Sequence, residues 1–274
     1  MTAKCAVCGG DATIDSELRD DLVECRGCGL IYRPGATEDR AEFGERYFVE
    51  GAYSDYVAER EAIRGSAARR LRALERMVRG RRLLDVGCAA GYFLEAAKNR
   101  GWEPSGLELS PYAAARARTQ GLDVHEGSIL APPDVAPFDV ITMWDTIEHL
   151  SEPGLALDNA RRLLRSGGII VISTGDRRSA MARLLGRRWR LLGDQTHKFF
   201  FDEATLSTLL INARLRPIAS NHAGKWVGLG MVLYQLGIPG ASKVRRAIAA
   251  TGWNPSIYVN LWDVITMVAG AARS

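Results

Sequence analysis

The sequence predicts an α/β protein with a doubly wound, mostly parallel sheet and a small N-terminal zinc ribbon. Three observations lead to this fold class. An apolar run at residues 83–86 passes through a turn of small residues into a segment with helical spacing, which is a strand–loop–helix unit. Similar strand-then-helix steps recur at residues 102–120 and 138–164, as a parallel sheet requires. Four of the five cysteines fall within residues 5–28.

The turn after the first strand suits a nucleotide-type ligand. Its small residues, from Gly87 to Gly91, would let backbone N–H groups and the start of the next helix approach a ligand closely. Asp85 ends the strand, where a carboxylate can hold a cationic or N–H-bearing ligand. The second strand ends in Glu108, at roughly the 20-residue spacing at which a strand-end acid meets ribose hydroxyls. Helix–strand packing alone can also require small residues, so the loop by itself leaves both interpretations open.

Two segments carry a family resemblance. D-V-G-C-A-A-G at residues 85–91 and G-L-E-L-S at residues 106–110 resemble class I S-adenosylmethionine-dependent methyltransferases. The resemblance implies a Rossmann-like fold with S-adenosylmethionine as cofactor. Ala89 stands where the family has glycine, and its methyl group would narrow the loop. An NAD-binding loop is the alternative, against which the rest of the chain argues. The cofactor-binding residues that the resemblance implies are Asp85, Gly87, Cys88, Ala89, Gly91, Tyr92, Phe93, Glu108, Leu109, Ser128, Ile129, Trp144 and Asp145.

Later segments narrow the resemblance. W-D-T-I-E-H-L at residues 144–150 resembles the subgroup that contains ubiquinone-biosynthesis O-methyltransferases and many glycan and natural-product methyltransferases. Ser128 stands where many relatives have an aspartate that grips adenine, and a hydroxyl would bond adenine more weakly. His149 could be a general base, because an unperturbed imidazole has a pKa of about 6.5. The alternative is a histidine that bonds the backbone and shapes the pocket.

The N-terminal cysteines predict a zinc site. Cys5-x2-Cys8 and Cys25-x2-Cys28 have the pairing and separation of four-cysteine zinc sites, and glycine follows each pair. Disulfides fit poorly with this spacing and with a reducing compartment. With four protein ligands the zinc would be structural and would supply the folding energy of this segment. Cys88, in the loop, is expected to pack rather than to act as a nucleophile.

Composition limits the partners and the compartment. The 274 residues are enough for one full α/β domain and a small appendage. A net charge of +4 permits an anionic substrate but argues against a nucleic-acid partner. The chain opens without a signal-peptide pattern and has no apolar run long enough to span a membrane, so a cytoplasmic protein is expected. The expected partner is a small-molecule or glycan acceptor, with peripheral membrane contact left open and the oligomeric state not predictable.

We expect four parts, namely a zinc ribbon over residues 1–33, a linker and helical cap over 34–80, the core over 81–221 and an extension over 222–274. The cap should contain a helix over residues 58–82. Its aromatic residues either pack on the core or cover the cofactor, because aromatic rings attract a sulfonium centre. These residues are Phe43, Tyr47, Phe48, Tyr53 and Tyr56. The extension should supply a closing strand near residues 260–265 at the sheet edge, and its apolar residues an acceptor wall, a dimer face or a membrane-resting patch.

The segment after the fifth strand should select the acceptor. Arginines crowd residues 177–190, which fits either a solvated amphipathic helix or a site for a phosphate-bearing substrate or an anionic membrane. Residues 193–201 resemble the family's insertion before the last helix, where a histidine commonly faces the acceptor. The resemblance therefore makes His197 the preferred general base and His149 the second candidate.

The expected function is methyl transfer to an oxygen of a sugar, a lipid-linked saccharide or a natural product. Because the transfer is an in-line displacement, the enzyme mainly positions the acceptor oxygen and removes its proton. The alternative is an RNA base methyltransferase with a zinc-ribbon RNA-binding module, against which the mild charge and the lack of a basic run within residues 1–33 argue. A third interpretation, a zinc-ribbon binding protein with a degenerate methyltransferase fold, is suggested only by Ala89 and Ser128.

Overall fold

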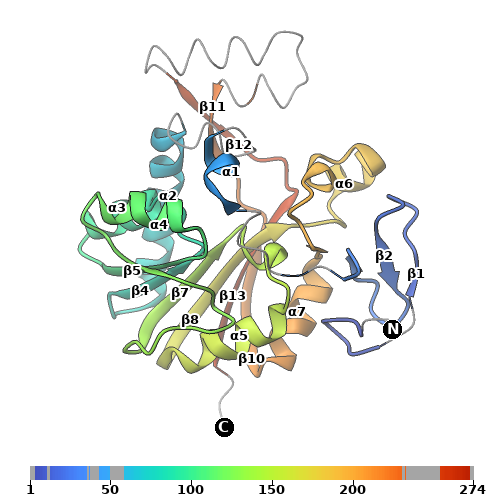
Figure 1. Cartoon of the computed structure of the whole chain (residues 1–274), viewed down its shortest axis with the longest axis horizontal. Coiled ribbons are helices and arrows are strands. Elements are labelled where there is room, and N and C mark those ends of the chain that lie inside the picture. The colour runs from blue at the N-terminus through green and yellow to red at the C-terminus, as the bar shows by residue number, and fades with distance from the viewer. Residues whose placement is uncertain are drawn as a thin grey trace.

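A seven-stranded sheet forms the centre of the protein (Figure 1), in a computed structural model that describes residues 4–10, 13–35, 37, 43–49, 59–229, 232 and 254–271. The strand order is β10-β13-β8-β7-β4-β5-β6. These strands are β4 (Arg82–Val86), β5 (Glu103–Glu108), β6 (Asp123–Glu126), β7 (Phe138–Trp144), β8 (Leu164–Gly175), β10 (Leu215–Asn221) and β13 (Val264–Ala271). Strands β6, β5, β4, β7 and β8 run parallel to one another, and β13 runs antiparallel to both of its neighbours, β8 and β10. The predicted doubly wound, mostly parallel sheet is confirmed, and its order reverses between β4 and β7, where such sheets bind ligands.

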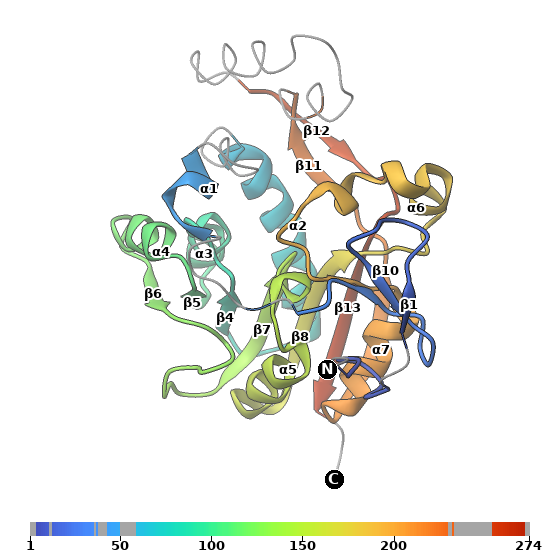
Figure 2. The same ribbon diagram turned by 45° about the vertical axis from the view of Figure 1, so that its right-hand side comes forward.

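Helices cover both faces of the sheet (Figures 1 and 2). One face packs against α2 (Arg60–Met77), α3 (Tyr92–Lys98) and α4 (Pro111–Arg118), whose buried alanines and leucines form one apolar cluster with the sheet. The other face packs against α5 (Pro153–Arg162) and α7 (Glu203–Asn212) in a second cluster. The shorter helical segments are α1 (Glu45–Val49), α6 (Ala180–Leu185) and the 3-10 turns η2 (Ile147–His149), η3 (Gly186–Arg188) and η4 (Arg190–Gly193).

Local signals account for where several helices begin and end. Ser110 caps α4 by accepting from the Ala113 N–H, and Asp202 forms a capping box with Thr205 at the start of α7. The helix expected over residues 58–82 is shorter than predicted. It ends at Met77 because the chain then turns extended and passes close to Asp139 at Gly80, where a Cβ atom would have no room.

The N-terminal segment forms a second sheet with a strand of the core. Its strands are β1 (Thr13–Asp15), β2 (Val23–Cys25) and β3 (Ile31–Tyr32), and the fourth strand is β9 (Phe199–Phe200). Residues of this segment also join the core cluster beneath α5 and α7, including Val7, Leu30 and Tyr32. The ribbon is therefore packed onto the core rather than tethered beside it.

The C-terminal part differs from the expected edge strand. A two-stranded sheet of β11 (Lys225–Gly228) and β12 (Ser256–Val259) packs on α2, where the Trp226 N–H donates to Ser66 Oγ at 2.9 Å. The closing strand β13 begins at Val264 and lies between β8 and β10, so β10 is the edge. Expectations for Tyr53, Tyr56 and most of residues 230–253 concern positions outside the described residues.

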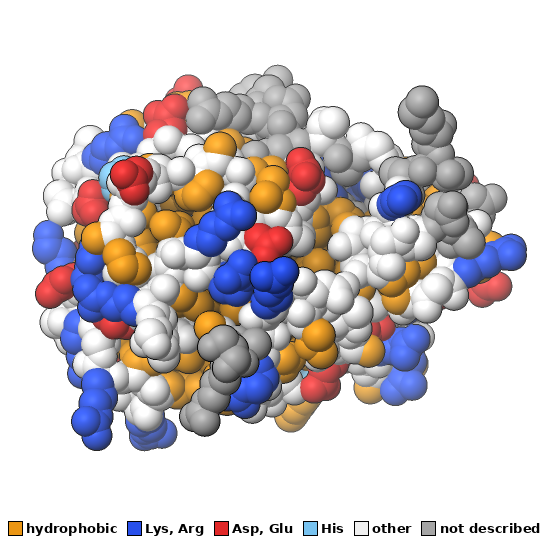
Figure 3. Space-filling model, turned by 90° about the horizontal axis from the view of Figure 1, so that it is seen from below, with side chains coloured by type: hydrophobic (Ala, Val, Ile, Leu, Met, Phe, Trp, Pro, Cys, Tyr) orange, Lys and Arg blue, Asp and Glu red, His pale blue; other side chains and the backbone are white. Residues whose placement is uncertain are grey.

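The face of the protein seen from below carries both basic and acidic side chains (Figure 3). Seen from below, basic side chains lie in several separate groups among acidic and hydrophobic ones (Figure 3). Within the described residues, no helix is long and apolar enough to cross a membrane.

Candidate active site

The loop after β4 makes a tight turn against β7. Gly87 adopts a φ of 74°, and a Cβ atom there would come within 2.6 Å of Thr146 Oγ1, so glycine is required. Gly91, the residue before α3, has a φ of 81°, and a Cβ atom there would approach Leu122 to 2.4 Å. Ala89 also lies in the left-handed region, with a φ of 48°. This conformation explains why glycine suits position 89 and shows that alanine still forms the turn.

Glu108 is buried at the end of β5 and braces this loop. Its carboxylate accepts the N–H of Ala89 and the N–H of Ser110, each at 2.8 Å. Burial raises the pKa of Glu108, while these backbone N–H groups oppose the rise. Each carboxylate oxygen keeps a further lone pair for a ligand. Glu108 can therefore hold the loop and accept hydroxyl donors at the same time.

Asp85 lies below the loop rather than in the ligand cavity. Its side chain is buried and accepts a hydrogen bond from Thr142 Oγ1 at 2.6 Å. Burial raises the pKa of Asp85 to about 7, although this hydrogen bond and the charge of Arg70 oppose the shift. Cys88 is also buried and packs against Gly106, as a packing residue should. Both residues support the loop from beneath.

A cavity opens at the carboxyl ends of β4, β5 and β7, and α1 forms one of its walls. Of the thirteen predicted cofactor residues, it brings together eight: Gly87, Ala89, Glu108, Leu109, Ser128, Ile129, Trp144 and Asp145. The other five, which do not line it, are Asp85, Cys88, Gly91, Tyr92 and Phe93. Phe43, Tyr47 and Phe48 line the cavity as well. The described aromatic residues of the cap therefore face the space over the loop.

The end of β7 turns sharply at Asp145, which has a φ of 51°. Ser173 Oγ donates to the Asp145 carboxylate at 2.9 Å, and Lys225 Nζ lies 3.5 Å from the same group. Burial alone would raise the pKa of Asp145, but the charges of Lys225, Arg70 and Arg190 hold it well below its usual range. Asp145 therefore remains ionised.

Two buried histidines lie side by side next to this cavity. The ring centroids of His149 and His197 are 4.7 Å apart. Each Nδ1 lies 3.1 Å from a backbone carbonyl, of Thr196 and Leu191 respectively, so Nδ1 carries the proton and Nε2 keeps its lone pair. His149 lines the cavity, where Phe43 packs edge-on against it, and His197 does not line it. The geometry favours His149 over His197 as the group nearest a ligand.

Neither imidazole has the unperturbed pKa that the sequence suggested. Burial lowers the pKa of His149 to about 4, and the neighbouring His197 lowers it further. Burial also lowers the pKa of His197, against the charge of Asp194. Both rings are therefore neutral at pH 7 and can accept a proton.

Sequence reasoning did not assign a role to Glu148, which lies between these groups. Its side chain is buried, and its Oε2 atom has no hydrogen-bond partner among the described residues. Burial and the charge of Asp145 raise the pKa of Glu148 to about 8. Ligand atoms of Glu148, His149 and His197 lie within 4.8 Å of one another, a spacing that a divalent cation could also bridge. The sequence signal that could have identified Glu148 is its position in the I-E-H-L string, next to His149.

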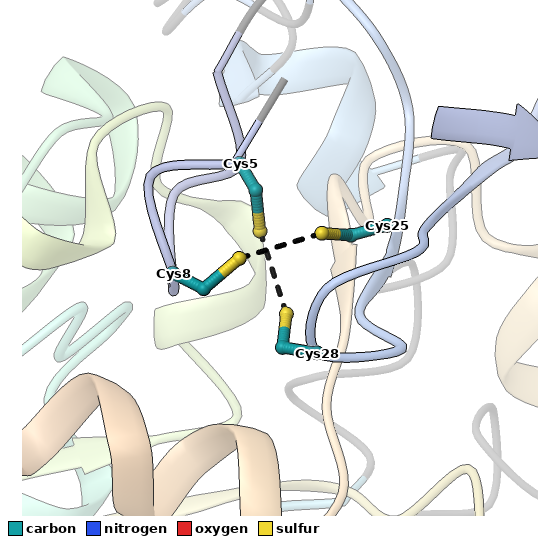
Figure 4. Close-up of side chains that lie close together, drawn as sticks. All are labelled: Cys5, Cys8, Cys25 and Cys28. Carbon is teal, nitrogen blue, oxygen red and sulfur yellow. Dashed lines mark hydrogen bonds between the residues drawn. The ribbon is translucent and has the colours of Figure 1, made fainter. Parts of the chain in front are cut away.

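The four N-terminal cysteines converge on one point (Figure 4). The sulfur atoms of Cys5 and Cys28 are 3.6 Å apart, and those of Cys8 and Cys25 are 3.4 Å apart. All four sulfurs lie within 4.8 Å of one another, and none forms a disulfide. Four sulfurs around zinc at 2.3 Å would be about 3.8 Å apart. The cluster therefore has the dimensions of a tetrahedral zinc site.

The ribbon holds the segment that carries His197. Strand β3 pairs with β9, which begins two residues after His197. The Arg33 N–H donates to the Lys198 carbonyl at 2.9 Å, and the Arg33 guanidinium donates to the carbonyl of His197. Lys198 Nζ donates to the His149 carbonyl at 2.8 Å. Arg33 and Lys198 therefore tie the ribbon to both histidines, and no local sequence signal announced this contact.

Four of the six arginines in residues 177–190 are paired with carboxylates, including Arg187, which lies 3.6 Å from Asp20. Arg177 and Arg178 lie 3.3 and 3.0 Å from Asp202, and Arg190 lies 3.2 Å from Asp263. The ion pairs of Arg177, Arg178 and Arg190 therefore tie this segment to the core and to the residue before β13.

A comparison with protein families shows which family the chain belongs to. The family described as "Methyltransferase domain" matches residues 57–219, more than half of the chain. The chain belongs to this family, the class I S-adenosylmethionine-dependent methyltransferases. The observed Rossmann-like sheet agrees with that membership.

Curated relatives of this methyltransferase include ubiquinone biosynthesis O-methyltransferases. The protein of that name from Alkalilimnicola ehrlichii is 33% identical over 43% of this chain and 53% of its own. The Xylella fastidiosa protein is 32% identical over 50% of this chain and 61% of its own. The chain thus spans less than two thirds of the length of these two relatives.

Solved structures show the same fold. A SAM-dependent methyltransferase from Archaeoglobus fulgidus is 18% identical, with a TM-score of 0.54 over 79% of this methyltransferase and 99% of its own chain. The CcbJ methyltransferase from Streptomyces caelestis is 14% identical, with a TM-score of 0.53 over 76% of this chain and 90% of its own. At these identities the likeness concerns the fold alone.

Proposed function

We propose that this methyltransferase transfers a methyl group from S-adenosylmethionine to a hydroxyl oxygen of a small molecule or glycan, such as a sugar, a lipid-linked saccharide or a natural product. The observation that carries the proposal is the position of His149, whose neutral imidazole lines the same cavity as Glu108 and the Gly87 turn. The printed names of the curated relatives, which are O-methyltransferases, support oxygen as the acceptor atom.

The residues of the cavity fit the cofactor. The Gly87 turn leaves no room for a Cβ atom and exposes backbone to the cavity, and Glu108 keeps lone pairs suited to ribose hydroxyls. The rings of Phe43, Tyr47 and Phe48 supply faces that attract a sulfonium. When bound, S-adenosylmethionine would supply an electrophilic methyl group. Ser128 Oγ accepts the Leu130 N–H at 3.1 Å and would be a weak adenine partner.

His149 is the general base in this proposal, and His197 positions it. The His149 Nε2 atom would accept the hydroxyl proton while Nδ1–H stays bonded to the Thr196 carbonyl, which fixes the tautomer. The aromatic residues above the cavity would exclude water from the reacting oxygen. His197 packs against the His149 ring and is held in turn by the ribbon.

We further propose that the four cysteines bind one structural zinc ion. The supporting observations are the sulfur spacing and the matching turns, each with a glycine in the left-handed region, at Gly9 and Gly29. The division at residues 1–33, 34–80, 81–221 and 222–274, the cytoplasmic location and the absence of a nucleic-acid partner stay predictions.

The test is acceptor capture with kinetics of matched variants. Incubation with methyl-labelled S-adenosylmethionine and an extract of its own cells should label a small molecule or glycan, whose methyl group is then located by mass spectrometry. With that acceptor, His149→Ala should lower turnover by about 10²- to 10⁴-fold and leave cofactor affinity near normal.

His125→Ala is the matched control, because His125 lies on β6, is 40% exposed and faces no cavity described above. Label that disappears on ribonuclease treatment would favour the RNA alternative instead. Full turnover in both His149→Ala and His197→Ala would show that neither histidine removes the proton and that the enzyme acts by positioning the reactants alone.

A further inference from the structure

A second and larger cavity lies next to the cofactor cavity. It has a volume of about 410 Å³, within the range of small-molecule sites. It lies between α2, the β11–β12 sheet and the strands β8 and β13, and its lower walls are apolar, including Leu74, Val171 and Val268. Trp144 lines both cavities. A ligand in the second cavity would thus lie beside the space assigned to the cofactor.

The mouth of this cavity is strongly cationic. Arg69, Arg70, Arg190 and Lys225 line it, whereas Asp263 is the only carboxylate of its described lining. Arg190 is paired with Asp263 at 3.2 Å, and Lys225 lies 3.5 Å from Asp145 at the junction of the two cavities. Arg69 donates to the Tyr258 hydroxyl, so the lining of this cavity carries more cations than carboxylates.

These cations are placed where a ligand could reach them. The Arg70 guanidinium stacks on the Trp144 ring, with its central carbon 4.0 Å from the ring centroid. The Lys225 side chain is 43% exposed and that of Arg190 is 29% exposed. Lys225, Arg70 and Arg190 also lie near enough to the Asp145 carboxylate for their charges to lower its pKa.

We propose that this cavity binds an oxyanion, a phosphate or carboxylate group carried by the methyl acceptor, through Arg70, Arg190 and Lys225. This inference rests on the proposed function, because it takes the ligand of the second cavity to be the acceptor. Guanidinium groups match the planar or tetrahedral oxyanion with paired hydrogen bonds, and Lys225 adds a point charge. The apolar lower walls would hold the carbon skeleton of the ligand, and the hydroxyl to be methylated would lie past Trp144, on the side of His149.

Phenyl phosphate and phenol are a suitable probe pair, because they share a ring and differ in the charged group. Calorimetric titrations of the full chain, with and without S-adenosylhomocysteine and at constant ionic strength, should show that phenyl phosphate binds more tightly than phenol. Lys225→Gln and Arg70→Gln should each weaken phenyl phosphate binding by about 10- to 100-fold and leave the phenol titration unchanged. Arg72→Gln is the matched control, an exposed arginine of the same helix outside the cavity lining.

Lys225→Gln keeps the test decisive should Arg70→Gln lower the melting temperature, since Lys225 lies on a partly exposed strand. Equal binding of phenol and phenyl phosphate, or binding that neither substitution weakens, would overturn the inference. Binding to vesicles containing phosphatidic acid without binding to phenyl phosphate would overturn it too, in favour of a lipid surface. If the protein does not bind S-adenosylhomocysteine, the proposed function is contradicted instead. The phenyl phosphate titration without S-adenosylhomocysteine then still tests whether the second cavity binds an oxyanion.

Discussion

The loop and the carboxylate of the cofactor side come from one continuous stretch of chain, whereas the acceptor side of the candidate site is assembled from distant segments. Gly87, Ala89, Glu108 and Ser128 follow one another along β4, β5 and β6. On the other side, His149 contacts Thr196, and Arg33 of the ribbon bonds the carbonyl of His197. A substitution on the cofactor side should therefore affect cofactor binding alone. The acceptor side, in contrast, should also be disturbed by substitutions far away in the sequence.

The largest expected effect is the loss of turnover when the distant zinc ribbon, which holds the acceptor side, is unfolded. Cys25→Ser should remove about one zinc per chain and unfold the ribbon, because metal binding supplies on the order of 10 kcal/mol in small zinc modules. Turnover should fall by about 10²-fold or more, since β3 and Arg33 no longer hold the His197 segment. Affinity for S-adenosylhomocysteine should change little. Metal analysis, turnover and calorimetry on one preparation measure all three.

Cys88→Ser is the control for the zinc measurement, because Cys88 is the one cysteine outside the cluster. It should keep its zinc. Full turnover in zinc-free protein would show that the ribbon does not position the histidines and would remove the contrast between the two sides.

The next largest effect is a loss of cofactor affinity that leaves the acceptor side unchanged. Glu108→Ala removes a buried carboxylate that braces the loop, and such a charged hydrogen-bonding group contributes about 1.5–3 kcal/mol, so affinity for S-adenosylhomocysteine should fall roughly 10- to 150-fold. Zinc content should not change. Glu103→Gln is the matched control, because Glu103 begins the same strand and its side chain is 75% exposed. Unaltered binding in Glu108→Ala, or tight binding of NAD to the parent, would overturn the cofactor assignment.

A third prediction concerns the protonation of the histidine pair. Because the pKa of His149 is about 4 in the fold and about 6.5 when unfolded, the unfolded state binds the extra proton first as pH falls. The stability that His149 contributes is thus fully present above pH 6.5 and is lost as pH falls toward 4. Asp85 and Glu148, with pKa values of about 7 and 8, act in the opposite sense, since the folded state holds their protons more tightly.

The comparison with His149→Gln isolates the histidine from these carboxyls. Between pH 6.5 and 4, the free energy of unfolding of the parent should fall by on the order of 2–3 kcal/mol relative to this variant, as measured by urea denaturation. His125→Gln should follow the parent, because His125 is partly exposed. Parallel stability curves for parent and His149→Gln would show that the imidazole is not desolvated.

The same contrast explains what the sequence could predict. The fold class, the loop and Glu108 follow from short segments whose strand and helix signals are local, so they were predicted, and eight of the thirteen cofactor residues line one cavity. The preference for His197 over His149 rested on a resemblance, and the structure places His149 nearer the cavity. The pairing of residues 31–32 with 199–200 has no local signal, because a strand edge selects its partner only in the folded chain. The insertion of β13 between β8 and β10 was missed for the same reason.

The smallest expected effect sharpens the cofactor side. Ala89 has a left-handed backbone, which costs a non-glycine residue about 1–2 kcal/mol, whereas glycine loses about 0.4–1 kcal/mol more conformational entropy on folding. Ala89→Gly should therefore raise the free energy of unfolding by under about 1 kcal/mol, measured by urea denaturation, and keep the N–H bonded to Glu108. Ala90→Gly, one residue on and buried without a positive φ, should be destabilised instead, which controls for glycine in this loop. If Ala89→Gly is also less stable, the Ala89 methyl group contributes more by packing than its backbone strain costs, and the alanine would then be a fitted part of the cavity wall rather than a tolerated departure from the family's glycine.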